Sequence, residues 1–302
     1  MGYIFIVPTT SLECNVILNP VSVHYSPLRY PGGKGRLAGF FKEVFRLNNL
    51  CGAHYVEPYA GGAGVAFSLL MTEYSGHIHL NDISYPLYCF WRSVIDYTED
   101  LCRKINDTHV TPEEWEKQKK LLLNQLENNI VRIGFAFFFL NRTNRSGVID
   151  GGIIGGKSQQ GQWKIDARFN KKELIRRIEC IAEYNHRIHL YNLDAEYFLG
   201  SVVSALPQNT LVYLDPPYYE RGQRLYQNYY DEKDHETIAS LLQSQICHPW
   251  VVSYDDCDNI HRLYRERKGF TYTLNYSAAE RRIGKEVMFF SDNLNIPMSL
   301  SN

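Results

Sequence analysis

The chain has 302 residues, of which 44% are hydrophobic and 14% aromatic, and its formal net charge is −1. This length allows a full hydrophobic core and usually forms one large domain or two unequal ones. A net charge so close to zero excludes binding of a polyanion through the field of the whole molecule, so such a partner would have to meet a local basic surface.

The first segment, residues 1–27, is a short extension interrupted by prolines, and its sequence assigns it no function. Its apolar start has neither the basic flank nor the length of a signal peptide or a membrane span. The seven cysteines of the chain are scattered and never occur in a CxxC spacing, which favours reduced thiols. We therefore expect a cytoplasmic protein.

A glycine-rich turn opens the next segment and combines the aromatic ring of Tyr30, the backbone of Gly33 and the ammonium of Lys34. Such a turn before a helix would hold a carboxylate or a phosphate. It is not a P-loop, because the four-residue spacer between glycines and the Ser or Thr after the lysine are absent. Taken in isolation, these residues are better explained as a tight turn.

Residues 37–84 have the pattern of a helix followed by a β-loop-α-β unit, with strands over 54–57 and 77–80 and helices over 37–47 and 65–71. The loop of this unit is rich in glycine, which lets backbone approach a ligand without Cβ atoms in the way. A carboxylate at the end of the second strand, Asp82, suits a vicinal diol such as that of a ribose. The unit predicts nucleoside binding. The alternative is a glycine turn that serves helix packing and a solvated aspartate.

Residues 85–169 interrupt this alternation. Helical periodicity over 87–105 and 112–140 predicts an inserted, mostly helical module, and its end, 141–169, is glycine-rich and lies in the basic part of the chain. Arginine suits guanine or phosphate, and asparagine suits adenine. The candidates for contact with DNA are Asn141, Arg142, Asn144, Arg145 and Lys157. For a single lysine, a solvated surface position explains the sequence equally well.

Residues 170–302 return to alternation, with helices over 171–186 and 235–246, strands over 187–191, 210–214 and 250–254, and a closing antiparallel hairpin of 270–276 and 287–291. Asp194 follows the first of these strands, where a solvated loop carboxylate is one interpretation. At the end of strand 210–214, two consecutive prolines fix the backbone, so Asp215 and the carbonyl of Pro216 would face one amino group, with Tyr218 as a stacking surface. The alternative for this segment, which includes Pro217, is a plain turn.

Five motifs now occur in one order: Arg29 to Lys34 (RYPGGK), Val56 to Gly64 (VEPYAGGAG), Leu80 to Asp82 (LND), Leu140 to Thr143 (LNRT) and Asp215 to Tyr218 (DPPY). In these motifs the chain resembles the Dam-like, or D12 class, DNA adenine N6-methyltransferases from about Pro27 to Ser291. The resemblance implies an α/β fold: a Rossmann-like S-adenosylmethionine-dependent methyltransferase sheet with an inserted, mostly helical target-recognition domain. It divides the chain into an extension (1–27), a catalytic domain (28–84 and 170–302) and the insert (85–169).

The resemblance also implies the reaction, a methyl transfer from S-adenosylmethionine to N6 of a flipped adenine in double-stranded DNA. The product of the cofactor is S-adenosylhomocysteine, no metal is needed, and the protein is expected in a prokaryote or a phage. Carried over by position, the catalytic residues are Asp215, Pro216, Pro217 and Tyr218. The cofactor-binding residues are Tyr30, Gly33, Lys34, Glu57, Tyr59, Ala60, Gly61, Gly62, Asp82, Asp194 and Asp215.

Two alternatives stay open at this point. An Asp-Pro-Pro-Tyr pocket binds an amino group and does not by itself distinguish the base, so the same chemistry on N4 of cytosine stays open. The order of the motifs favours adenine. The other alternative is a DNA-binding module of the same fold without activity. After Thr143 the chain departs from the family's pattern, so the family's recognition sequence is not carried over.

Overall fold

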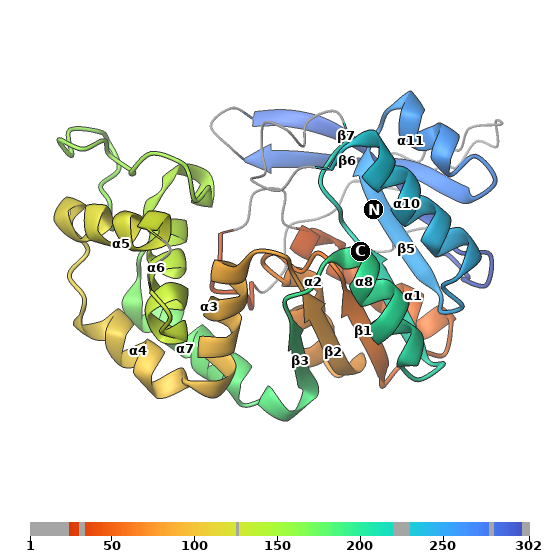
Figure 1. Ribbon diagram of the computed structural model, residues 1–302, viewed down its shortest axis with the longest axis horizontal. Helices are drawn as coiled ribbons and strands as arrows, with labels where there is room; N and C mark the ends of the chain where they lie inside the picture. The colour runs from red at the N-terminus through yellow and green to blue at the C-terminus, as the bar shows by residue number, and fades with distance from the viewer. Residues whose placement is uncertain (1–23, 30–33, 125–126, 220–229, 278–280, 298–302) are drawn as a thin grey trace, which may run out of the picture.

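The computed structural model describes residues 24–29, 34–124, 127–219, 230–277 and 281–297 (Figure 1). A seven-stranded sheet organises these residues, with the strand order β3-β2-β1-β4-β5-β7-β6. Its strands are β1 (Ala53–Glu57), β2 (Ser75–Asn81), β3 (Ile188–Tyr191), β4 (Thr210–Leu214), β5 (Trp250–Asp255), β6 (Lys268–Ser277) and β7 (Arg281–Phe290). The first five in this order pair in parallel, while β7 pairs antiparallel with both β5 and β6. The predicted Rossmann-like α/β fold is confirmed.

Helices cover both faces of the sheet because its central strands are apolar on both sides. In β1, Tyr55 points into the core with α1 (Ala38–Leu47) and α2 (Gly64–Met71), whereas Val56 points into the core on the opposite face. That second core contains side chains of α8 (Ala195–Tyr197), α10 (Glu232–Ser244) and α11 (Asp258–Leu263). Short helical turns complete these layers: η1 (Lys34–Leu37), η3 (Asn185–Arg187), η4 (Phe198–Val202) and η5 (Val203–Ala205).

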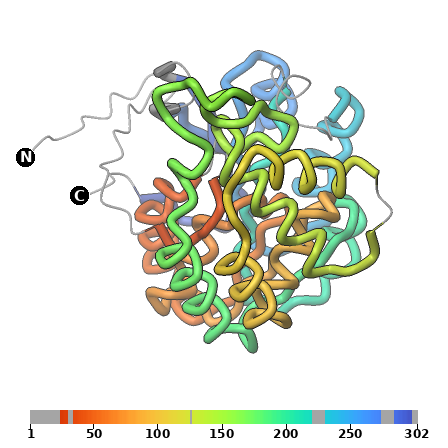
Figure 2. The backbone as a smooth tube through the Cα atoms, turned by 90° about the vertical axis from the view of Figure 1, so that its left-hand side faces the viewer, coloured from red at the N-terminus to blue at the C-terminus, as the bar shows by residue number. Residues whose placement is uncertain are grey.

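The inserted helices lie beside the sheet, at the left of Figure 1, and Figure 2 shows them from that side. They are α3 (Tyr85–Asp96), α4 (Thr98–Asp107), α5 (Pro112–Asn124) and α6 (Ile130–Thr143), followed by the turn η2 (Arg145–Gly147). Aromatic rings fill the space between them; the rings of Phe90 and Phe138 stack with centroids 5.3 Å apart. Next along the chain, α7 (Lys171–Ala182) packs against α3 and α4. The division into a catalytic domain and a recognition insert stays a prediction.

Element boundaries differ from expectation in several places. The helical stretch expected over 112–140 is two helices, α5 and α6. The helix expected over 87–105 is two helices, α3 and α4, broken at Tyr97, and α7 ends at Ala182 before the turn η3. The strand β7 begins at Arg281, six residues before the expected start at Val287. Within the described residues, no helix is both long and apolar enough to cross a membrane.

Candidate active site

The sheet reverses its direction of winding between β1 and β4. From β1 the chain passes to β2 and β3 on one side, and from β4 it passes to β5 on the other. Loops that leave the carboxyl ends of two such strands diverge and leave a crevice, which is where α/β sheets bind ligands. Here these loops are the glycine-rich loop after Glu57 and the segment that begins at Asp215. The fold therefore places two motifs that are far apart in the sequence at one crevice.

Hydrogen bonds to both the N–H and the carbonyl of Gly61 hold the glycine-rich loop. The N–H of Gly61 donates to Oδ2 of Asp82 at 3.0 Å, and its carbonyl accepts a hydrogen bond from Nε1 of Trp91, in α3, at 3.1 Å. Gly61 has a φ of 47°, in the left-handed region that favours glycine. Oδ1 of Asp82 accepts the N–H of Ser84 at 2.9 Å. Burial raises the pKa of Asp82, against the effect of these two N–H donors.

Glu57 lies at the end of β1 with only 5% of its surface exposed. Its Oε1 accepts the N–H of Ala66 at 3.1 Å, one of the first N–H groups of α2, which have no partner within the helix. Burial raises the pKa of Glu57 to about 8, although the N–H of Ala66 acts in the opposite direction. These contacts favour a role in holding the start of α2. The neighbouring Ala60 is buried, and its N–H donates to the carbonyl of Asn81 at 2.8 Å.

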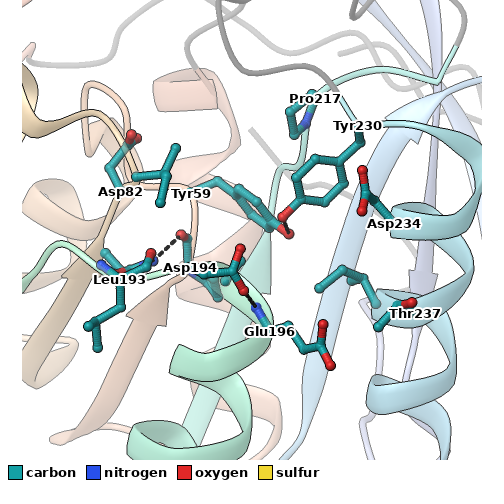
Figure 3. Close-up of a pocket in the computed structure, with 14 residues that line it drawn as sticks. Tyr59, Asp82, Leu193, Asp194, Glu196, Pro217, Tyr230, Asp234 and Thr237 are labelled. Atoms are coloured by element: carbon teal, nitrogen blue, oxygen red, sulfur yellow. Dashed lines mark hydrogen bonds between the residues drawn. The ribbon is translucent and has the colours of Figure 1, made fainter.

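A pocket of about 400 Å³ opens at the crevice, between the ends of β1, β2 and β3 and the start of α10 (Figure 3). Tyr59, Asp82 and Asp194 line it, and Tyr230 closes it on the side of α10, with its hydroxyl 2.9 Å from that of Tyr59. Asp194 is exposed, and its Oδ1 accepts the N–H of Glu196 at 2.9 Å at the start of α8. The pocket thus combines aromatic surface with two carboxylates, the set of groups that a nucleoside needs.

A buried cluster of charges lies behind Asp215. Nζ of Lys34, in η1, is 3.0 Å from Oδ1 of Asp215, 3.1 Å from the hydroxyl of Tyr218 and 3.2 Å from Oε2 of Glu286. Burial alone would lower the pKa of Lys34, but the two carboxylates raise it well above its usual value. The pKa of Asp215 is raised by burial, in opposition to Lys34 and in the same direction as Glu286. The structure therefore joins the first and last predicted motifs through an ammonium and a carboxylate.

Two residues expected to contact DNA are buried inside the insert. The carboxamide of Asn141, 1% exposed, accepts the N–H of Arg29 and donates to its carbonyl, both at 2.8 Å. Oδ1 of Asn144, fully buried, accepts Nε1 of Trp115 at 2.6 Å, and its Nδ2 donates to the carbonyl of Val148 at 2.8 Å. Because these amides are already engaged within the protein, the structure favours a structural role for both over the expected contact with a base.

Three basic residues of the same stretch differ in exposure. Arg142 is half-buried, and its Nε donates to the carbonyl of Arg168 at 2.7 Å. Its pKa is lowered to about 9, mainly by burial and to a smaller extent by the positive charges of nearby arginines. Arg145 is exposed. Lys157 is exposed and pairs with Glu116 at 2.8 Å. Arg145 and Lys157 are therefore the two predicted DNA-binding residues that a large ligand would reach without rearrangement.

The remaining predicted residues are either outside the described part of the chain or are placed by their exposure and position. Tyr30 and Gly33 lie outside the described residues, as do positions 1–23 of the extension. Gly62 is half-exposed in the glycine-rich loop, Pro216 is buried and Pro217 lines the pocket.

Sequence reasoning missed Trp91, Ser253 and Glu286. Ser253 follows an apolar run at the end of a predicted strand, so its place at the same edge of the sheet as Asp215 could have been inferred. Glu286 has no local signal, because its partners come from residues 34, 218 and 272.

Comparison with known proteins adds one finding. A family model described as D12 class N6 adenine-specific DNA methyltransferase matches residues 30–280. No curated protein matches the chain.

Proposed function

The chain belongs to the D12 class N6 adenine-specific DNA methyltransferases, and we propose which of its residues hold the cofactor, the target base and the DNA. Its activity is site-specific methylation of adenine in DNA with S-adenosylmethionine. Among the two alternatives, the family assignment favours adenine over cytosine and an enzyme over an inactive module.

The cofactor fits the pocket at the crevice. S-adenosylmethionine supplies a methyl group that its positively charged sulfur makes electrophilic. We propose that Asp82 accepts the ribose hydroxyls, that Tyr59 and Asp194 lie beside the adenine, and that backbone of Ala60, Gly61 and Gly62 approaches the methionine part. The support is the pocket of about 400 Å³, which these residues line or adjoin. The cofactor contacts of Tyr30 and Gly33, which lie outside the described residues, stay predictions, whereas the contacts of Lys34 and Glu57 favour supporting roles.

The acceptor for the target amino group is Asp215. Its Oδ1 is occupied by Lys34 and by the hydroxyl of Ser253, each at 3.0 Å, while among the described residues its Oδ2 has no hydrogen-bond partner. We propose that Oδ2 and the carbonyl of Pro216 accept the two hydrogens of N6 and so direct the nitrogen lone pair towards the methyl group. When N6 takes the methyl group, the electron pair of the broken S–C bond would stay on sulfur, and N6 would lose a proton to solvent. Pro217 keeps the segment rigid.

Tyr218 would stack on the flipped base. Only 6% of its surface is exposed, so access of a base requires movement of the surrounding chain. A base leaves double-stranded DNA at a cost of a few kcal/mol, which stacking and the new hydrogen bonds offset. Arg145 and Lys157 would meet the DNA backbone. A reaction that needs no metal stays a prediction, and activity that survives a chelator would support it. The cytoplasmic location and the origin in a prokaryote or a phage also stay predictions.

The observation that carries this assignment is the half-engaged carboxylate of Asp215, and Asp215→Asn tests it. We expect kcat for methyl transfer to DNA to fall about 100-fold or more, because one acceptor becomes a donor at the reacting nitrogen. Asp215 does not line the pocket proposed for the cofactor, so binding of S-adenosylmethionine, measured by calorimetry, should stay within about threefold of wild type despite the cofactor contact expected from the sequence. Asp100→Asn, an exposed aspartate of α4, is the matched control. Methylation at the wild-type rate by Asp215→Asn would contradict the proposed role.

A further inference from the structure

Glu286 is a buried carboxylate on β7 that stands opposite two other residues of the sheet. Its Cα partners are Asp255 of β5 and Tyr272 of β6. It therefore lies on the middle one of the last three strands of the sheet, and β5 separates this strand from β4, which Asp215 follows. Only 1% of its surface is exposed. A carboxylate so removed from water is costly unless it is paired and hydrogen-bonded. Its partners therefore indicate why it is there.

Its side-chain partners among the described residues belong to the reaction site or support it. Oε1 accepts the hydroxyl of Tyr218 at 2.5 Å and lies 3.3 Å from Nζ of Lys34. Oε2 accepts the hydroxyl of Tyr272 and lies 3.2 Å from the same Nζ. Glu286 thus fixes the far end of the tyrosine ring and one side of the lysine at the same time.

Lys34 has three ammonium hydrogens and three partners for them. One is Asp215 and another is the hydroxyl of Tyr218, so Glu286 takes the third. With its hydrogens committed in this way, the ammonium cannot rotate or withdraw without breaking a buried contact. The lysine is held at one place against Oδ1 of Asp215.

Strand β5 supports Asp215 from a second direction. The hydroxyl of Ser253 donates to Oδ1 of Asp215 at 3.0 Å, and the hydroxyl of Tyr213 lies 2.9 Å from Oγ of Ser253. Because Ser253 uses its single hydrogen on Asp215, Tyr213 must be the donor in the second bond. Also in β5, Asp255 accepts the N–H of Tyr219 at 2.8 Å and anchors the backbone that follows Tyr218. The acceptor segment is therefore clamped from β5 and β7.

We propose that Glu286 is a positioning residue for methyl transfer, which through Lys34 and Tyr218 keeps one oxygen of Asp215 engaged and the other available to the target amino group. The inference rests on the proposed function of Asp215. Charge adds to geometry: Asp215, Lys34 and Glu286 together carry one negative charge when all three are ionised. Positive charge moves onto N6 during transfer, and a site with net negative charge beside it stabilises that change. Without the charge of Glu286, Lys34 would neutralise Asp215.

The test is Glu286→Gln, which keeps the shape of the side chain and removes its charge. We expect kcat to fall about 10- to 100-fold, while KM and calorimetric Kd for S-adenosylmethionine change less than about threefold. The acid limb of the kcat–pH profile should move to lower pH, since Glu286 raises the pKa of Asp215. A merely structural residue would not move that limb. Glu286→Asp, which keeps the charge, should recover part of kcat and the wild-type limb, and Glu266→Gln, an exposed glutamate, is the matched control.

The outcomes separate the two proposals. If Asp215→Asn is inactive but Glu286→Gln has wild-type kcat and an unshifted profile, the inference is overturned and the proposed function stands. If Asp215→Asn is as active as wild type, the proposed function itself fails. Should circular dichroism show that Glu286→Gln does not fold, Tyr272→Phe decides: it removes only one donor to Glu286, and we expect kcat to fall about twofold to fivefold. Unchanged kcat in Tyr272→Phe would then overturn the inference.

Discussion

Four histidines form a ladder across β1, β2 and β3, and it makes the stability of the protein sensitive to acid. His54 is the Cα partner of His77, and His79 is the partner of His189. The rings of His79 and His189 stack with centroids 4.4 Å apart, and Nδ1 of His54 is 2.9 Å from Nε2 of His79. His79 is only 3% exposed. Burial, and then the neighbouring histidines, lower its pKa to about 3.

The size of the effect follows from the two pKa values of His79. Its ordinary value is 6.5 and its value in the folded protein is about 3. Between them the unfolded chain binds a proton that the folded protein does not, so stability is present above pH 6.5 and is lost as the pH falls below it. From pH 7 to pH 5, His79 alone should lower the free energy of unfolding by about 2 kcal/mol.

Urea unfolding followed by circular dichroism at pH 7, 6 and 5 measures this loss. We expect His79→Gln, which has no proton to gain, to lose about 2 kcal/mol less than wild type between pH 7 and pH 5. His109→Gln, an exposed histidine outside the ladder, is the matched control and should follow the wild type. Equal losses in wild type and His79→Gln would refute the reasoning.

Two further predictions concern the cofactor and the DNA. Trp91→Phe removes the donor to the buried carbonyl of Gly61. We therefore expect binding of S-adenosylmethionine, measured by calorimetry, to weaken about fivefold. Trp163 is exposed, and Trp163→Phe should have no effect. Unchanged affinity in Trp91→Phe would show that the glycine-rich loop does not need this bond. DNA affinity is to be measured by fluorescence anisotropy at several salt concentrations. Arg145→Ala should reduce the slope of log affinity against log salt concentration by about one unit. Substitution of another exposed arginine, Arg265→Ala, should leave this slope unchanged. The same slope in both variants would exclude a phosphate contact for Arg145.

The β-loop-α-β unit was predictable because its signals are local. An apolar strand, a run of glycines and a second strand that ends in Asp82 follow one another within residues 53–82, and the structure has them as β1, α2 and β2. The closing hairpin was also predicted, but its second strand was placed too late. Residues 281–286 are mostly polar, so their pattern does not indicate a strand. Glu286 occupies a buried strand position because its side-chain partners come from η1, from the segment after β4 and from β6.

The family, the order of the motifs and the residues that meet at the crevice can be read from the sequence, because they depend on short segments with their own backbone requirements. The roles of neighbouring polar residues cannot, because they depend on how distant elements pack. Asn144 and Arg145 are adjacent in one motif, yet the first is fully buried and the second exposed. Glu286 bonds to Lys34 across 252 residues of sequence. The partners of a buried polar group come from whichever elements pack around it, so they are fixed by the assembly of distant strands and helices and not by local sequence.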